Sequence, residues 1–329
     1  PAHIAVQGYL KLAAQGKYRE ALQLIKRENP FPAVCGRICN RRCEDACTRG
    51  TVDEAVAIDE VKRFIAQQDL DAETRFIPEK VIPKVDGEFS EKIAIIGGGP
   101  AGMSCAYYLA EKGYRPTVFE KESRPGGMLM NAIPSFRLEK DVVEAEIDVL
   151  RALGVEFRCG VEVGKDITIA QLREEGYKGF YVAVGLQHGG ALAVPGGDAE
   201  NVISGIDFIR GVHLRDEKAL KGRVVVIGGG NIAADVARTA VRCGAESVSL
   251  YCLEGYEEMP MGEEDRSECE REGIAIYAGW GPKEVQTENG KADNIAFVKC
   301  LSVKDENGRF APVYDENTVQ MAPCGTVLY

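Results

Sequence analysis

The chain has 329 residues, of which 45% are hydrophobic, and a formal net charge of −11 at pH 7. This length and apolar content suffice for two or three domains and exclude a disordered protein, and an acidic chain is unsuited to binding nucleic acid. The sequence has no apolar run of the roughly 20 residues that a membrane span requires, and no secretory signal at its start. Eleven cysteines, an odd number, do not resemble a secreted disulfide framework, so we expect a cytoplasmic protein.

Residues 1–70 are predicted to form a small α-helical domain. Within residues 4–28 the apolar side chains have helical spacing and predict two short amphipathic helices separated at Gly16. The prolines within 29–32 end the second helix, and the apolar spacing over 58–65 predicts a third. A domain of this size has little core of its own, and a metal centre is one way to stabilise it.

Four cysteines of this domain fall within thirteen residues: Cys35, Cys39, Cys43 and Cys47. Thiolates bind zinc and iron–sulfur clusters, so we predict that these four are metal ligands. Their regular three-residue gaps differ from the two-residue gaps usual in zinc knuckles, and a cluster that carries electrons has a use beside a redox cofactor. We therefore favour an iron–sulfur cluster over a structural zinc ion or free thiols.

A first dinucleotide-binding domain is predicted over 91–211, after a linker over 71–90 that contains two prolines and mixed charges. An apolar strand leads into the glycines of 97–102, which open a helix. Glycine allows a tight turn and lets a pyrophosphate approach the N–H groups at the positive end of that helix. Glu120 follows about 20 residues later, at the end of the next predicted strand, where a carboxylate is placed to accept hydrogen bonds from a ribose.

A second copy of this device begins at Gly228, about 130 residues after the first, and predicts a second nucleotide-binding domain over 212–329. It too has an apolar strand before the glycines and a helix after them, which is the context that the motif requires. Two such sites imply two dinucleotides.

Together these motifs resemble the glutamate synthase small subunit family. That family includes the N-terminal part of dihydropyrimidine dehydrogenase and the large subunit of NADH-dependent ferredoxin:NADP oxidoreductase. The resemblance covers almost the whole chain, and the segments that carry it are 29–32 with the cysteines, 97–102, Glu120, 126–129, 133–138, 228–235 and 257–260.

The resemblance implies an α/β fold with two Rossmann-like nucleotide-binding domains, preceded by a small α-helical iron–sulfur domain. The NAD(P) domain is inserted in the FAD domain, as in glutathione-reductase-like folds. In this arrangement residues 326–329 resemble the strand that re-enters the flavin domain, whose remaining C-terminal part is missing from this chain.

The resemblance also implies the cofactor contacts. For FAD these are Gly97, Gly99, Pro100, Ala101, Gly102, Glu120, Lys121, Gly127, Met128, Leu129, Arg137, Ala183 and Gly185; for NAD(P) they are Gly228, Gly229, Gly230, Asn231, Ile232, Cys252 and Glu254. The family usually holds two [4Fe-4S] clusters, with some ligands upstream of the first residue here. Some members use a Gln or Glu at the position of Lys62, which is a poor ligand while protonated.

The choice between NAD(H) and NADP(H) depends on the end of the second strand of the nicotinamide domain. Members of the family that bind NADP often have two adjacent arginines there, which meet the 2′-phosphate. This chain has Cys252, Leu253 and Glu254 instead, and a carboxylate repels a phosphate. The sequence therefore favours NAD(H), with Arg242 or Arg271 as the alternative source of a phosphate contact.

The function implied is that of an oxidoreductase module that moves electrons between NAD(P)H, FAD and [4Fe-4S] clusters, to or from a partner subunit. The partner would be a glutamate synthase-like or ferredoxin-linked component of a hetero-oligomeric complex. We expect no catalytic side chain, because hydride passes between stacked cofactors. The absence of a Cys-x4-Cys pair after the first glycine motif argues against a disulfide reductase. The alternatives are a non-catalytic assembly subunit with structural nucleotide and metal, and a zinc-containing FAD reductase.

Overall fold

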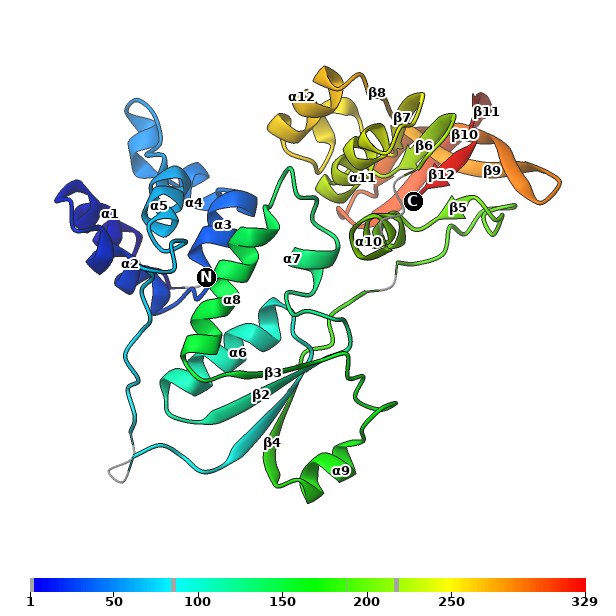
Figure 1. Ribbon diagram of the computed structural model, residues 1–329. Helices are drawn as coiled ribbons and strands as arrows, with labels where there is room; N and C mark the ends of the chain where they lie inside the picture. The colour runs from blue at the N-terminus through cyan, green and yellow to red at the C-terminus, as the bar shows by residue number, and fades with distance from the viewer. Residues whose placement is uncertain (1–2, 84–86, 188, 216–218) are drawn as a thin grey trace. The chain divides into compact units, whose positions relative to one another are not determined.

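The computed structural model describes residues 3–83, 87–187, 189–215 and 219–329 (Figure 1). The chain divides into two compact units, Pro1–Gly185 and Leu186–Tyr329. Each unit contains one of the two glycine motifs.

The first unit begins with short helices, of which the sequence predicts three: α1 (Val6–Ala14), α2 (Tyr18–Lys26) and α5 (Ile58–Gln67). The cysteine segment between them, for which no helix was predicted, forms α3 (Pro32–Ile38), α4 (Arg42–Asp45) and the 3-10 turn η1 (Thr48–Thr51). Gly16 has a φ of 73° and lies at the turn between α1 and α2, a backbone conformation that glycine adopts without strain. Tyr9, Leu22, Ile25 and Ile65 are buried together and form a small core of these helices.

The helix α3 does not belong to that small core. Phe31, Ala33 and Val34 are buried in the core of the neighbouring nucleotide-binding part, together with residues such as Val143 and Ile147. The N-terminal helices are therefore anchored through α3 to the rest of the first unit. Residues 71–90, of which 84–86 lie outside the described residues, were predicted to be a linker between the two parts. Near the C-terminal end of this segment, the ring of Phe89 stacks on that of Tyr114 with ring centroids 4.2 Å apart.

A four-stranded parallel sheet forms the centre of the first unit, in the order β3-β2-β1-β4. Its strands are β1 (Lys92–Ile96), β2 (Arg115–Glu120), β3 (Glu156–Cys159) and β4 (Tyr177–Val182), and its helices are α6 (Pro100–Glu111), α7 (Met128–Asn131), α8 (Lys140–Ala152) and α9 (Ile169–Glu174). Along β1 the side chains alternate between faces, so Ile95 packs with α6 and α8 whereas Ala94 packs with Leu172 of α9. Figure 1 shows α6 and α8 on one side of these strands and α9 on the other.

The second unit contains a five-stranded parallel sheet in the order β5-β12-β6-β7-β8 and a three-stranded antiparallel sheet in the order β11-β10-β9. The strands are β5 (Val202–Ile203), β6 (Arg223–Ile227), β7 (Ser247–Cys252), β8 (Ala275–Ala278), β9 (Trp280–Glu288), β10 (Lys291–Lys304), β11 (Phe310–Pro323) and β12 (Thr326–Leu328). The helices are α10 (Gly205–Arg215), α11 (Asn231–Arg242), the 3-10 turn η2 (Tyr256–Glu258) and α12 (Glu263–Arg271). The two sheets share a core in which the rings of Tyr251 and Phe297 stack at 3.9 Å.

Two expectations about the division of the chain differ from the structure. Residues 186–211, predicted to belong to the flavin domain, lie in the second unit. The prediction that 326–329 returns to the flavin domain is also wrong. Thr326–Leu328 forms β12, which pairs with β5 and β6, and Val327 and Leu328 are fully buried in the cores of the second unit.

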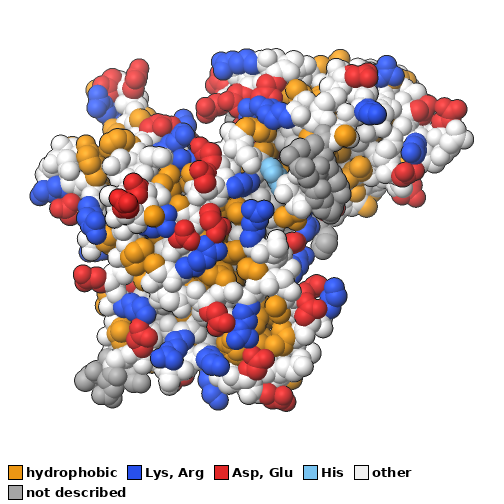
Figure 2. Space-filling model, in the orientation of Figure 1, with side chains coloured by type: hydrophobic (Ala, Val, Ile, Leu, Met, Phe, Trp, Pro, Cys, Tyr) orange, Lys and Arg blue, Asp and Glu red, His pale blue; other side chains and the backbone are white. Residues whose placement is uncertain are grey.

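The surface carries charges of both signs. On the face shown in Figure 2, acidic and basic side chains are interspersed and do not gather into a basic patch. Among the described residues, no helix has the length and apolar content to cross a membrane.

Candidate cofactor-binding sites

The first glycine loop lies between β1 and α6, and its backbone leaves no room for side chains. Gly97 has a φ of 109°, and a Cβ placed on it would lie 2.2 Å from the carbonyl oxygen of Ala183. A Cβ on Gly102 would lie 2.0 Å from the carbonyl oxygen of Gly97. The N-cap residue of α6, Gly99, provides no side-chain cap, and Pro100 is the first helical residue. The N-terminus of α6 therefore offers N–H groups and a positive dipole end to an anion.

Glu120 braces this loop from the end of β2. Its Oε2 accepts a hydrogen bond from the N–H of Gly98 at 2.7 Å, and its Oε1 accepts one from the N–H of Glu122 at 2.9 Å. The side chain is 5% exposed. The sequence assigned Glu120 to a ribose, and the structure gives it a second task, which is to hold the glycine loop in place.

A second glycine turn lies against the first. The N–H of Gly126 donates to the carbonyl oxygen of Gly98 at 2.8 Å. A Cβ on Gly127, whose φ is 54°, would lie 2.7 Å from the Cα of Gly99. This contact brings Gly127, and with it the start of α7 at Met128 and Leu129, beside the glycine loop. The predicted FAD residues of both turns are thus brought together.

Asn131, at the end of α7, is a further candidate site residue that the sequence analysis did not name. It is 5% exposed, and its Oδ1 has no hydrogen-bond partner among the described residues. A buried amide oxygen without a donor is costly, so a bound group that donates to it would be favoured. The only sequence signal was its place directly after the second glycine turn.

The two glycine turns, at 97–102 and 126–127, together form a backbone cradle. The remaining predicted FAD residues differ in how close to this cradle they lie. The N–H of Ala183 donates to the carbonyl oxygen of Ile96 at 2.8 Å, which places the end of β4 next to the loop. Gly185 follows with a φ of 67° and open space around it. Lys121 follows Glu120 directly, and Arg137 is half-buried beyond α7. The tight loop, the uncapped helix and the orphaned Asn131 amide fit FAD.

The second glycine loop repeats this geometry between β6 and α11. Gly228 has a φ of 142°, and its N–H donates to the carbonyl oxygen of Tyr251 at 2.9 Å. A Cβ on Gly230 would meet no atom within 4 Å. Gly230 is also the N-cap residue of α11 and provides no side-chain cap. The space above Gly230 and the open helix N-terminus fit a nucleotide diphosphate.

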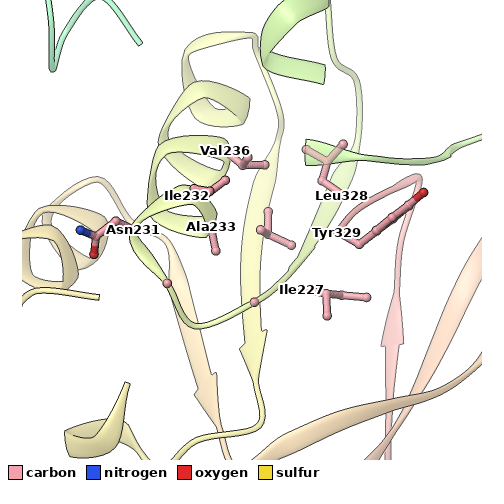
Figure 3. A pocket seen from close by; sticks show the side chains of 10 residues that line it. Ile227, Asn231, Ile232, Ala233, Val236, Leu328 and Tyr329 are labelled. Atoms are coloured by element: carbon pink, nitrogen blue, oxygen red, sulfur yellow. The ribbon is translucent and has the colours of Figure 1, made fainter. Parts of the chain in front are cut away.

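A cavity of about 310 Å³ adjoins this loop. Figure 3 shows Ile232, Ala233 and Val236 of α11 on one side of it and Ile227, Leu328 and Tyr329 on the other. Four of the predicted residues line this cavity: Gly228, Gly230, Asn231 and Ile232. The Oδ1 of Asn231 also accepts a hydrogen bond from the N–H of Gly262 at 3.2 Å.

Glu254 lies beside this loop much as Glu120 lies beside the first. Its Oε2 is 2.8 Å from the position that a Cβ of Gly229 would occupy. Cys252 is buried at the end of β7, and burial raises the pKa of its thiol to about 11, so it stays protonated at neutral pH. Its place beside Gly229 is that of a packing residue.

Two arginines were considered for contact with a 2′-phosphate. Arg242 pairs with Glu272, and Arg271 is exposed at the end of α12. The sequence analysis missed Arg266, whose guanidinium lies 4.4 Å over the ring of Tyr256 and donates to the carbonyl oxygen of Tyr256 at 2.5 Å.

The four cysteines of the N-terminal part lie on successive short elements. Cys35 is in α3, Cys39 is its C-cap residue, Cys43 is in α4, and Cys47 precedes η1. All four are half-buried free thiols. Burial raises the pKa of Cys35 and of Cys43, and backbone hydrogen bonds lower the pKa of Cys47.

The donor chemistry of these thiols fits an iron–sulfur cluster, but their arrangement in this structure does not form a closed site. Within the described ranges, no three Cys, His, Asp or Glu side chains are grouped as ligands of one metal ion. The four cysteines therefore stay predicted ligands. Lys62, at the position where some relatives of the family have a ligand, is buried and paired with Asp59 at 2.5 Å.

Comparison with known families gives two matches along the chain. The family described as pyridine nucleotide-disulphide oxidoreductase matches residues 91–312. The family described as dihydropyrimidine dehydrogenase domain II, 4Fe-4S cluster, matches residues 1–74.

Curated relatives match over the whole chain. The β subunit of the NADP(+)-dependent formate dehydrogenase of Moorella thermoacetica is 36% identical over 351 residues, covering 100% of this chain and 49% of the relative. The glutamate synthase [NADPH] small chain of Halomonas elongata is 34% identical, covering 100% of this chain and 71% of the relative. The chain thus spans about half the length of the first of these relatives.

Among solved structures, the oxidoreductase FprA of Mycobacterium tuberculosis superposes with a TM-score of 0.62 at 19% identity, covering 73% of this chain and 70% of that protein. At this identity the likeness is one of fold.

Proposed function

The chain belongs to the pyridine nucleotide-disulphide oxidoreductase family and has a 4Fe-4S domain before its nucleotide-binding part, and on this basis we propose its place in an electron-transfer complex. It is an oxidoreductase that uses NAD(P)H, FAD and a 4Fe-4S cluster. We infer that the whole protein moves electrons between these cofactors, to or from a partner subunit.

The observation that carries the proposal is the pair of glycine cradles. Each follows a parallel strand, opens an uncapped helix and is flanked by a carboxylate, Glu120 in one unit and Glu254 in the other. Bound together, a nicotinamide and a flavin exchange a hydride without help from a side chain, which is consistent with the absence of a predicted catalytic residue. The protein's own task is to bind and orient the two dinucleotides.

The residues proposed to bind FAD in the first unit are Gly97, Gly99, Pro100, Ala101, Gly102, Glu120, Lys121, Gly127, Met128, Leu129, Arg137, Ala183 and Gly185, to which the structure leads us to add Asn131. Those proposed for the nicotinamide coenzyme are Gly228, Gly229, Gly230, Asn231, Ile232, Cys252 and Glu254. Cys35, Cys39, Cys43 and Cys47 are the proposed cluster ligands of this chain.

The proposal of a partner rests on the names of the two relatives, both of which are subunits. One is a β subunit of formate dehydrogenase, and the other is a small chain of glutamate synthase. We propose that this chain likewise serves a partner subunit, either glutamate synthase-like or ferredoxin-linked. We propose the cytoplasm as the location of the complex, because eleven cysteines stay reduced there.

For the coenzyme we propose NADH, although these two relatives are named for NADP(H). The support is Glu254, which follows the end of β7 and whose carboxylate reaches Gly229. A carboxylate at this position would accept a hydrogen bond from a ribose 2′-OH and repel a 2′-phosphate. Arg266 of α12 already donates a hydrogen bond to the carbonyl oxygen of Tyr256.

The test is an anaerobic visible spectrum of the full-length parent protein, recorded before and after adding NADH and, separately, NADPH, together with metal analysis. We expect a flavin band that NADH bleaches and a broad iron–sulfur absorbance. Flavin and iron that neither coenzyme reduces would reject the oxidoreductase module in favour of an assembly subunit. Zinc in place of iron would support the zinc-containing reductase.

A further inference from the structure

Glu146 is a buried carboxylate that none of the proposed cofactor sites uses. It lies in the middle of α8, in the nucleotide-binding part of the first unit, and is 2% exposed. Its Oε1 accepts a hydrogen bond from the N–H of Ala33 at 2.9 Å, and its Oε2 accepts one from the N–H of Val34 at 3.0 Å. Both donors belong to the first turn of α3, more than a hundred residues earlier in the chain.

These two bonds complete the start of α3. Pro32 has no N–H, and the N–H of Phe31 donates to the Oδ1 of Asn29 at 3.0 Å. The first helical bond runs from the N–H of Cys35 to the carbonyl oxygen of Phe31 at 3.0 Å. Between them lie Ala33 and Val34, whose N–H groups have no acceptor within α3. Both donate to Glu146, so one side chain of α8 satisfies the donors in the first turn of α3.

The surroundings of this carboxylate are apolar. Phe31, Ala33 and Val34 share their core with Val142, Val143 and Ile147, the latter three on α8. Burial raises the pKa of Glu146 to about 7, while the two N–H bonds act in the opposite direction. An apolar side chain would be easier to bury here, so the carboxylate is explained by the two N–H groups that it accepts.

A second contact supports the same junction. Arg37, near the other end of α3, donates through its Nε to the Oε2 of Glu139 at 2.6 Å, and Glu139 is the N-cap residue of α8. The helix α3 is thus tied to α8 at both of its ends. Its opposite side packs closely on α5, since a Cβ on Gly36 would lie 2.9 Å from the Cα of Arg63.

We propose that Glu146 is a positioning residue for the cysteine segment: it fixes the start of α3 on the flavin-binding part and thereby sets the place of Cys35 and Cys39 relative to it. Cys35 follows Val34 directly, and Cys39 ends the same helix. The inference rests on the proposed function in one respect, namely that these cysteines hold an iron–sulfur cluster.

The test compares Glu146→Gln with Glu144→Gln in the full-length protein carrying its cofactors. Glutamine has the same shape but presents an NH2 group to one of the two N–H donors, which removes one bond and adds a repulsion. Glu144 lies on the same helix, its side chain is 40% exposed, and it pairs with Arg151, so its substitution controls for a lost charge. The measurements are amide hydrogen exchange of residues 31–39, iron per flavin, and the EPR spectrum of the reduced protein.

We expect roughly tenfold faster exchange at Ala33 and Val34 in Glu146→Gln, from the loss of a buried hydrogen bond. We also expect less iron per flavin or a shifted EPR spectrum, while flavin content and flavin reduction by the nicotinamide coenzyme stay at the wild-type level. Glu144→Gln should match the wild type in all of these. Equal exchange and equal iron in the two variants would overturn the proposal.

The wild type provides a test that does not depend on a variant folding. First-turn amides usually exchange fast, whereas Ala33 and Val34 should be protected as well as the interior of α8. Fast exchange at both would overturn the proposal. A wild type that contains flavin but no iron would refute the cluster assignment alone, since the exchange rates at Ala33 and Val34 still decide whether Glu146 holds α3.

Discussion

Glu120 ends β2, and Glu254 lies shortly after the end of β7, so the two carboxylates have matching positions in the two units. Glu120 accepts hydrogen bonds from the N–H of Gly98, in the glycine loop, and from that of Glu122. Replacing Glu120 by Ala removes both acceptors and the predicted ribose contact. We expect FAD affinity to fall roughly 10- to 100-fold. Flavin content after purification and FAD titration of the apoprotein measure this, with Glu174→Ala, an exposed carboxylate of α9, as the control. Unchanged FAD affinity would contradict the role given to Glu120.

Glu254 is the residue on which coenzyme choice is expected to depend. Removing its carboxylate in Glu254→Ala takes away the acceptor for a 2′-OH and the repulsion of a 2′-phosphate. The Kd for NADH should rise about tenfold, and the preference for NADH over NADPH should shrink or reverse. Stopped-flow flavin reduction with each coenzyme measures both effects. If the wild type prefers NADPH, Arg266 becomes the candidate for the phosphate contact, and Arg266→Ala would weaken NADPH binding.

Substitutions of two glycines should distinguish an effect on stability from an effect on cofactor binding. Gly102→Ala places a Cβ 2.0 Å from the carbonyl oxygen of Gly97, so we expect a loss of stability of about 1–3 kcal/mol together with loss of FAD. The Cβ of Gly230→Ala meets no atom within 4 Å, and it would enter the space that we propose for the diphosphate. It should leave the melting temperature unchanged and weaken NADH binding about tenfold. Thermal melts and NADH titrations of both variants check this, and equal melting temperatures would contradict it.

At the scale of elements, α11 and α12 are joined by a cluster of ion pairs. Arg238 pairs with Glu268 and Glu272, and Arg242 pairs with Glu272. Although burial alone would raise it, hydrogen bonds from Arg242 and Arg238 hold the pKa of Glu272 below its ordinary value of 4.5. A lowered pKa stabilises the fold above the pKa of the unfolded chain, and this contribution is lost as the pH falls through the lower, folded value.

Glu272→Gln should therefore lower the free energy of unfolding by about 2 kcal/mol at pH 7, and the difference from the wild type should shrink progressively below pH 4.5. Denaturation at a series of pH values measures it. Glu306→Gln, in the exposed turn between β10 and β11, is the control and should show no such difference. A difference that persists at the lowest pH would show that the ion pairs are not its cause.

What the sequence predicted about these elements depended on how local the signal was. The strands before both glycine loops and the helices after them were predicted, because glycines and apolar runs act over a few residues. The pairing of β12 with β5 was not predicted, because the two strands are more than a hundred residues apart and no local sequence pattern indicates which distant strands pair. For the same reason neither the contact of Glu146 with α3 nor the orphaned amide of Asn131 was visible before the fold.

At the scale of the whole molecule, the division at Gly185 and Leu186 is testable with a pair of fragments. The fragment 186–329 contains the complete five-stranded sheet with its glycine loop. It should unfold cooperatively and bind NADH with a Kd within about tenfold of that of the full chain, because the proposed coenzyme residues all lie within it.

The fragment 212–329 follows the boundary that the sequence predicted and should fail. It lacks β5, the partner of β12, and most of α10, including the buried Phe208 and Ile209. Each lost side chain removes roughly 2–3 kcal/mol, and together they approach the total stability of an ordinary domain. Circular dichroism and thermal melts of the two fragments check this, and equal stability would restore the boundary at 212.

The position of β12 between β5 and β6 also bears on how the protein is made. Ile203, the last residue of β5, leaves the ribosome long before Thr326, at translation rates that separate the two by roughly 6–25 s. During that interval β5 has no neighbour in its sheet, and β6 has one side unpaired, next to a glycine loop that is already complete in sequence. The second unit can therefore close its sheet only after its last strand is synthesised, so a ribosome stalled before Thr326 would hold a nascent chain with an open strand position.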